Sequence, residues 1–114
     1  MLVKEFEKDR LVCKVFSDRD SMGKYAAGQI AETMRELLSY KQEINMVFAA
    51  APSQNEVLYY LAQEKDLDWS RVNAFHMDEY IGLEKDSPKL FGRYLENALF
   101  KHVNIKTVYY IGTS

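Results

Sequence analysis

The chain has 114 residues, of which 47% are hydrophobic and 28% are charged, and its formal net charge at pH 7 is −2. This length allows one domain, and the hydrophobic fraction is that of a globular protein, which argues against disorder. Lysine and arginine are scattered along the chain, so no basic stripe indicates a nucleic-acid-binding face. We therefore expect a single domain over residues 1–114 that binds no nucleic acid.

The first residues and the cysteine content indicate the compartment. Residues 1–8 carry too many charges for a signal peptide, and no apolar run approaches the length of a membrane span. The single cysteine, Cys13, cannot form an intrachain disulfide, which fits a reducing compartment. We expect a cytoplasmic protein that does not contact a membrane.

The first predicted elements are a strand and a helix. The apolar pattern of residues 11–16 predicts a strand in which Cys13 is buried. Ser17 and Asp20 then resemble a capping box, with aspartate in place of the usual glutamate, and predict the start of a helix. Its predicted buried face repeats every three or four residues and comprises Met22, Ala26, Ile30, Met34 and Leu37.

The second pair of elements follows the same order. Residues 44–51 are nearly all apolar, which predicts a strand covered on both faces. Ser53 and Glu56 have the spacing of a capping box, so Ser53 is expected to cap the next helix. The predicted buried stripe of that helix comprises Val57, Leu58 and Leu61.

A third strand is predicted at residues 72–75 and a fourth at residues 108–111. Between them, Ser87 is expected to cap a third helix, with Pro88 in its first turn. The predicted apolar face of this helix comprises Phe91, Tyr94, Leu95, Ala98 and Leu99. Strands that alternate with helices predict right-handed crossovers and an α/β fold, with a three-layer, Rossmann-like parallel sheet.

Two adjacent carboxylates, Asp78 and Glu79, directly follow the predicted third strand. Open α/β sheets bind ligands at the carboxyl ends of their strands, where a carboxylate can take or give protons. An arbitrary Asp-Glu pair is more often two surface acids in a turn. From these residues alone, both interpretations remain open.

The loop of residues 49–54 leads into the predicted second helix. Free amides and the positive end of the helix dipole can hold an anion such as phosphate there. The small side chains of Ala50 and Ala51 allow close approach of the backbone, the Ser53 hydroxyl adds a donor, and Gln54 completes the candidate set. The loop has no glycine, so ordinary capping by Ser53 is the alternative.

The two histidines have different predicted roles. His76 precedes the acidic pair, where it can point into the crevice as a donor to the substrate or act as a structural loop residue. His102 lies near the end of the third predicted helix, where the helix dipole explains it. Nothing near His76 has the spacing of metal ligands, so we expect neither a metal nor a cofactor.

The run from Phe75 to Leu83 resembles the F-x-M-D-E-Y-x-G-L signature of glucosamine-6-phosphate deaminases. Ser87-Pro88 and residues 100–105 are also similar to that family, and the resemblance extends over nearly the whole chain. Relatives that act on 6-phosphogluconolactone typically have Asp-Glu-Arg at this point, so Tyr80 favours the amino-sugar branch. The deaminases often carry asparagine at the position of His76.

This resemblance implies a NagB-like fold that uses no metal and converts glucosamine 6-phosphate and water to fructose 6-phosphate and ammonia. It implies that Asp78 shuttles a proton between C1 and C2 during aldose–ketose isomerisation, and that Glu79 supports the hydrogen bonds of the site. The partner would be a small sugar phosphate, and we expect a homo-oligomer.

Two departures from the family pattern bear on this interpretation. The phosphate loop of the family usually reads T-G-x-T-P, whereas residues 50–54 keep only the hydroxyl of Ser53. Family members are also considerably longer, and their second half supplies a ring-opening histidine and basic residues for the phosphate. We therefore expect residues 1–114 to be the amino-terminal half of a NagB-like domain, inactive alone. The alternatives are another sugar-phosphate isomerase, a 6-phosphogluconolactonase-like hydrolase and a non-catalytic sugar-phosphate sensor.

Overall fold

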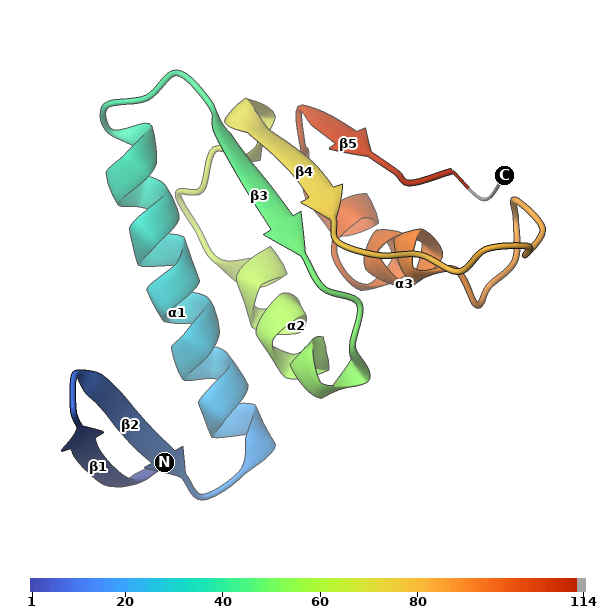
Figure 1. The fold of residues 1–114 in the computed structure, drawn as a ribbon. Coiled ribbons are helices and arrows are strands. Elements are labelled where there is room, and N and C mark those ends of the chain that lie inside the picture. The colour runs from blue at the N-terminus through green and yellow to red at the C-terminus, as the bar shows by residue number, and fades with distance from the viewer. Residues whose placement is uncertain (113–114) are drawn as a thin grey trace.

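The structure, a computed structural model that describes residues 1–112, contains two separate sheets (Figure 1). An antiparallel hairpin comprises β1 (Leu2–Lys8) and β2 (Leu11–Phe16). The parallel sheet comprises, in spatial order, β3 (Ile44–Phe48), β4 (Val72–His76) and β5 (Thr107–Tyr109). The predicted α/β class with a parallel sheet is thereby confirmed, although the last strand ends earlier than the predicted residues 108–111.

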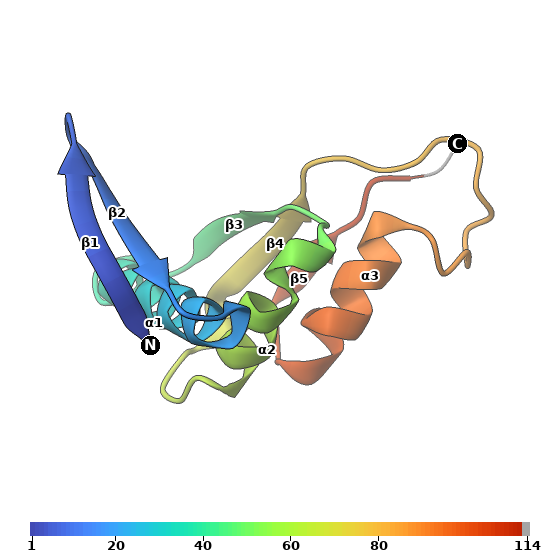
Figure 2. The same cartoon turned by 90° about the horizontal axis from the view of Figure 1, so that it is seen from below.

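The helices of the structure are α1 (Arg19–Leu38), α2 (Asn55–Gln63) and α3 (Phe91–Ala98). Figure 2 shows all three on the same side of the parallel sheet. Helices α2 and α3 each connect two neighbouring parallel strands, as the predicted crossovers require. Residues 1–112 thus provide two layers of the predicted three. None of their helices combines the length and hydropathy needed to cross a membrane.

The core lies between the parallel sheet and these helices, and Val72 of β4 and Leu95 of α3 are fully buried in it. Successive side chains of a strand point to opposite faces, so the helices cover every second position. On the other face of β3, Val47 is 68% exposed. The expectation that residues 44–51 form a strand covered on both faces is therefore wrong, and the strand itself ends at Phe48.

The amino-terminal hairpin differs from the prediction. Residues 11–16 form a strand, but it pairs with β1 and takes no part in the parallel sheet. The sequence pattern does not reveal β1, because this strand is exposed along its whole length and has no buried face. A two-residue turn at Asp9 and Arg10 is the available signal, since Asp9 adopts a φ of 55°, which aspartate tolerates better than most residues. Cys13 is half-buried rather than buried.

Helix α1 begins differently from the prediction. Its cap is Asp18, whose carboxylate accepts a hydrogen bond from the amide of Ser21 at 2.7 Å. The predicted capping box of Ser17 and Asp20 is therefore wrong. The carboxylate of Asp20 instead accepts a hydrogen bond from the hydroxyl of Tyr60 in α2 at 2.7 Å, so it joins two helices.

The buried face of α1 is rotated from the predicted one. Four predicted members are buried or half-buried, namely Ala26, Ile30, Met34 and Leu37. Met22 is 45% exposed, because α1 approaches α2 through Gly23 instead. A Cβ added at Gly23 would lie 2.5 Å from the Cβ of Glu56, which leaves room for glycine only. The buried positions of α1 are Gly23, Ala27, Ala31, Met34 and Leu38.

The apolar faces predicted for the other two helices are confirmed. In α2 the buried or half-buried residues include Val57, Leu58 and Leu61. In and after α3 they include Phe91, Tyr94, Leu95, Ala98 and Leu99.

Candidate functional site

Two loops leave the same edge of the parallel sheet, at the carboxyl ends of β3 and β4. Phe48 and His76 are register partners at these ends, and the amide of Met77 donates a hydrogen bond to the carbonyl of Phe48 at 3.1 Å. Residues 49–54 continue from β3 into α2, and residues 77–90 continue from β4 into α3 (Figure 1). The loop that contains the predicted anion-binding residues and the loop that contains the acidic pair therefore begin next to each other at the sheet edge.

Asp78 is exposed and lies just beyond the end of β4. The carboxyl end of a parallel strand is the predicted location, where α/β proteins bind their ligands. The main-chain carbonyl of Asp78 is 2.8 Å from Nδ1 of His76, so the backbone is held while the side chain is exposed. This carboxylate can reach a ligand at the sheet edge, and its role as a proton shuttle stays a prediction.

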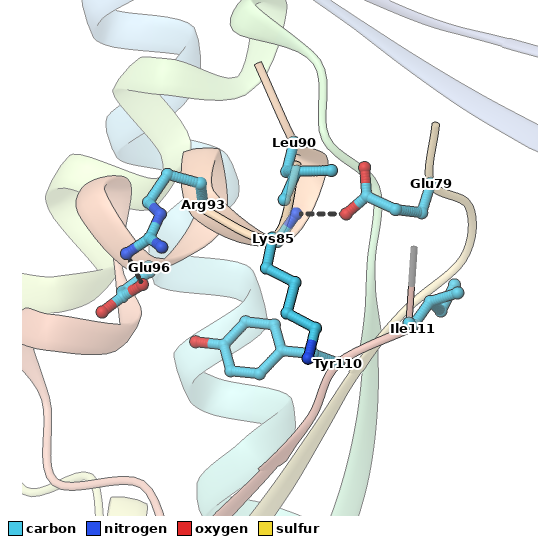
Figure 3. A pocket seen from close by; sticks show the side chains of 9 residues that line it. Glu79, Lys85, Leu90, Arg93, Glu96, Tyr110 and Ile111 are labelled. Carbon is cyan, nitrogen blue, oxygen red and sulfur yellow. Dashed lines mark hydrogen bonds and ion pairs between the residues drawn. The ribbon is translucent and has the colours of Figure 1, made fainter. Parts of the chain in front are cut away.

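Glu79 caps the amino terminus of α3 (Figure 3). Its carboxylate accepts hydrogen bonds from the amides of Phe91 at 2.8 Å, Gly92 at 3.0 Å and Tyr80 at 2.9 Å. Burial by itself would raise the pKa of Glu79, but the hydrogen bonds from these three amides lower it below its ordinary value. Glu79 is therefore held as a carboxylate and is suited to fixing the loop rather than to donating a proton.

This contact replaces the predicted cap at Ser87. Helix α3 begins at Phe91, three residues after Pro88, and its N-cap residue Leu90 makes no side-chain capping bond. The hydroxyl of Ser87 accepts a hydrogen bond from the amide of Lys89 at 3.2 Å, within the preceding turn. The prediction of a Ser87-Pro88 helix start is wrong because the cap comes from Glu79, which is distant in sequence.

A cavity of about 330 Å³ lies between α3, the end of β5 and the loop after β4 (Figure 3). Arg93 and Glu96 form an ion pair at 3.0 Å on the α3 side. Gly92 lets Tyr110 approach this wall closely, because a Cβ there would lie 2.7 Å from Cδ1 of Tyr110 and the ring would have to shift. The sequence pattern predicted a role for Glu79 but not for the other lining side chains, which include Lys85, Leu90, Arg93, Glu96 and Tyr110.

This cavity does not connect the predicted anion-binding loop of residues 49–54 with Asp78. Its lining includes Glu79 but neither Asp78 nor any residue of the loop at positions 49–54. The sequence pattern placed Arg93 and Glu96 on the third predicted helix and Tyr110 in the fourth predicted strand, but it did not indicate that they face one cavity. The two loops therefore start side by side at the sheet edge. The side chain of Glu79, however, lies in a cavity near the end of β5, which neither Asp78 nor residues 49–54 line.

The glycine-free loop of residues 49–54 is held by side chains from two other helices. The guanidinium of Arg19 in α1 donates to the carbonyl of Pro52 at 3.1 Å, and the hydroxyl of Tyr94 in α3 donates to the carbonyl of Ala51 at 3.1 Å. Within the loop, the side-chain amide of Gln54 donates to the carbonyl of Ala49. These contacts fix a backbone that has no glycine to shape it.

The capping box predicted for Ser53 and Glu56 at the start of α2 is wrong. A 3₁₀ turn at residues 52–54 precedes α2, and its N-cap residue Gln54 makes no side-chain capping bond. Glu56 instead pairs with Arg19 at 2.7 Å, so it does not reach back to Ser53. Ser53 is exposed, whereas Ala50 and Ala51 are half-buried. Anion binding by these residues stays a prediction, with the Ser53 side chain exposed at the loop.

His76 is 5% exposed, and both of its ring nitrogens contact the main chain. Nδ1 faces the carbonyl of Asp78 at 2.8 Å, and Nε2 accepts a hydrogen bond from the amide of Ile111 at 3.1 Å. This arrangement favours the structural role over contact with a substrate. His102 lies just after α3, with Nε2 2.9 Å from the carbonyl of Asn97. Within residues 1–112, no three His, Cys, Asp or Glu side chains form a group that could hold a metal ion.

The chain is similar to curated glucosamine-6-phosphate deaminases. It is 32% identical over 91 residues to the enzyme of Clostridium acetobutylicum, an alignment that covers 79% of this chain and 37% of that protein. It is 28% identical over 91 residues to the enzyme of Borreliella burgdorferi, covering 76% of this chain and 34% of that protein. The chain thus spans little more than a third of these relatives. No protein-family model matches the chain.

Solved structures show the same fold. A monomeric glucosamine-6-phosphate deaminase, described as a missing link of the NagB superfamily, superposes with a TM-score of 0.70 at 20% identity, covering 83% of this chain and 40% of that one. The 6-phosphogluconolactonase of Thermotoga maritima superposes with a TM-score of 0.72 at 28% identity, covering 80% of this chain and 42% of that one. The comparisons confirm both the predicted resemblance and the NagB-like fold, which two different reactions share.

Proposed function

We propose that this chain, which resembles glucosamine-6-phosphate deaminases over about four fifths of its length, supplies the proton-transfer group of an aldose–ketose isomerase/deaminase acting on an amino-sugar phosphate. The observation that carries the proposal is Asp78. Its side chain is exposed at the carboxyl end of the central strand β4, within the run that resembles the deaminase signature.

The proposed chemistry follows from the position of the acidic proton. In the open-chain sugar, C2 is acidified by the neighbouring carbonyl, so a well-placed carboxylate can remove its proton. Asp78 takes the proton from C2 and returns it to C1, while O1 gains a proton and the C2 amine loses one, so the C1 aldehyde becomes an alcohol and the C2 amine becomes an imine. Water then adds to C2 and ammonia leaves, so glucosamine 6-phosphate and water give fructose 6-phosphate and ammonia.

The phosphate would bind the loop of residues 49–54. The backbone of this loop, which Arg19 and Tyr94 hold, leads to the amino terminus of α2. The positive end of the helix dipole at that terminus favours negative charge. The exposed hydroxyl of Ser53 adds a donor, and the small side chains of Ala50 and Ala51 let the backbone approach the anion. Glu79 serves this site by holding the loop after Asp78 against α3.

Because the chain spans 37% of its curated relative, the complete activity is proposed for a longer protein. Residues 1–114 would be the amino-terminal half of its domain and would show no turnover alone. We expect a cytoplasmic homo-oligomer in which the open face of the sheet, including Val47 and Tyr109, is covered.

The test is an assay of the product of the intact reading frame. Glucosamine 6-phosphate should yield fructose 6-phosphate and ammonia in equal amounts. We expect Asp78→Asn to lower kcat by about 10²- to 10⁴-fold, the usual contribution of a positioned acid–base group. Asp86→Asn, a change of an exposed carboxylate in the same loop, is the matched control. Full activity of Asp78→Asn would exclude the assigned role.

The likeness to 6-phosphogluconolactonases supports a second candidate, hydrolysis of a phosphorylated lactone. A panel of phosphorylated aldoses and lactones separates the two reactions. Tyr80, where the lactonases typically carry arginine, favours the amino sugar. Turnover of 6-phosphogluconolactone without ammonia release from glucosamine 6-phosphate would establish the second candidate instead.

A further inference from the structure

Three consecutive residues after β4 are anchored to three different parts of the fold. The amide of Met77 donates to Phe48 at the end of β3, and the carboxylate of Glu79 caps α3. Between them, the carbonyl of Asp78 is tied through the ring of His76 to Ile111, which follows β5. The backbone at the exposed Asp78 side chain is therefore fixed by hydrogen bonds at Asp78 itself and at the residues before and after it.

The hydrogen bonds of His76 define its tautomer. The amide of Ile111 is a donor, so the Nε2 that it contacts at 3.1 Å must be unprotonated. A neutral imidazole then carries its single proton on Nδ1, which lies 2.8 Å from the carbonyl of Asp78 and donates to it. The buried ring uses both nitrogens on the main chain and keeps none for a substrate.

We propose that His76 is a positioning residue that fixes the main chain of Asp78 by donating from Nδ1 to its carbonyl, and that the Ile111 amide selects the tautomer in which Nδ1 is the donor. The inference rests on the proposed function, because it treats Asp78 as the proton-transfer group. A catalytic carboxylate must be held within fractions of an ångström of its productive position, and hydrogen bonds to its supporting backbone provide this. Asparagine, which the deaminases often carry here, can supply the donor to residue 78 but is too short to reach Ile111.

The tautomer can be measured without any enzymatic assay. In a two-bond ¹H–¹⁵N correlation spectrum of the ¹⁵N-labelled chain, His76 should show a protonated Nδ1 and an unprotonated Nε2. His102 is the internal control with the opposite expectation, because its Nε2 lies 2.9 Å from the carbonyl of Asn97 and should carry the proton. A protonated Nε2 at His76, or averaging of the two tautomers, would overturn the proposal.

Two substitutions separate the two hydrogen bonds. His76→Asn places an amide donor at the position of Nδ1 and removes the acceptor for Ile111, whereas His76→Gln places an acceptor near the position of Nε2 and removes the donor to Asp78. We expect hydrogen exchange of the Ile111 amide to accelerate about tenfold in His76→Asn and to stay slow in His76→Gln. In the product of the intact reading frame, kcat should fall about three- to tenfold in His76→Gln with KM unchanged, and stay within about twofold in His76→Asn.

The outcomes distinguish failure of this inference from failure of the proposed function. Equal loss of kcat in both variants would indicate a general structural role and overturn the positioning role. If Asp78→Asn is inactive while both His76 variants keep full kcat, the proposed function stands and the inference fails. If the tautomer and exchange results agree with expectation but Asp78→Asn remains fully active, the proposed function fails and takes the positioning role with it.

Discussion

The two loops at the carboxyl edge of the sheet are held by different kinds of contact. Residues 49–54 depend on side chains that reach in from α1 and α3, namely Arg19 and Tyr94. Residues 77–79 are held through main-chain amides and carbonyls, by way of Glu79 and His76. The first loop is thus held by side chains from other elements, whereas the second supplies the carboxylate that caps α3.

This difference predicts which of two properties, stability or anion binding, depends more on each loop. Removing a clamp from residues 49–54 frees a loop but leaves the ends of α2 and α3 intact. Removing Glu79 leaves the amides at the start of α3 without their acceptor, and unpaired amides near the protein interior are costly. We therefore expect changes in the second loop to affect stability most, and changes in the first to affect anion binding most.

The largest effect on stability is expected from Glu79→Ala. The substitution removes a charged acceptor from three amides, two of them in α3, so the free energy of unfolding should fall by about 2–3 kcal/mol. Urea denaturation followed by circular dichroism measures the change. Glu84→Ala, which removes an exposed carboxylate of the same loop, is the control. Equal losses in the two variants would mean that Glu79 does not act as the cap.

A smaller effect on stability and a specific effect on binding are expected from Tyr94→Phe. The change removes a hydroxyl that lies 3.1 Å from the carbonyl of Ala51 and also contacts the side chain of Asn55, and it should cost about 1 kcal/mol of unfolding free energy. If the loop binds phosphate, the KM for the sugar phosphate should rise about fivefold with little change in kcat. Tyr59→Phe, on the exposed side of α2, should change neither quantity. An unaltered KM in Tyr94→Phe would show that this clamp does not shape the anion site.

The smallest effect is a pH dependence of stability carried by Glu79. The pKa of this carboxylate is lowered in the folded protein, so between its folded and unfolded pKa values the unfolded state binds more protons. Its contribution is present above the ordinary pKa of 4.5 and is lost as the pH falls through the lowered value. Urea midpoints should therefore decline less steeply below pH 4.5 in Glu79→Gln than in the unaltered chain. Parallel curves would contradict the lowered pKa.

Much of the fold could be predicted because it depends on local patterns. The helical spacing of Leu58 and Leu61 directly reflects burial on one side of α2. The apolar run at residues 44–48 predicted the strand β3, but not that Val47 on its second face is exposed. The helix starts could not be predicted in the same way. Asp18, rather than Ser17, caps α1, and Glu79, rather than Ser87, caps α3. Several nearby side chains can accept from the same amides, and the packed chain selects among them.

The candidate site also has features that the sequence predicted and features that it did not. Asp78 lies where the strand pattern predicted it, because a residue that follows a parallel strand must emerge at the sheet edge. The cavity beside Glu79 and the clamp by Tyr94 were not predictable. Their members come from a loop, a helix and a strand whose relative rotation depends on side-chain packing.

By itself, the sequence determined the parallel α/β class, the position of the acidic pair and the resemblance to the deaminases. Each depends on neighbouring residues or on a short period, which a single chain records directly. Only the tertiary structure decided what holds the site. Glu79 reaches amides 12 and 13 residues away, His76 accepts from an amide 35 residues away, and Tyr94 donates to a carbonyl 43 residues away. Such hydrogen bonds have no period in the sequence, because they form only when packing brings distant backbone groups together.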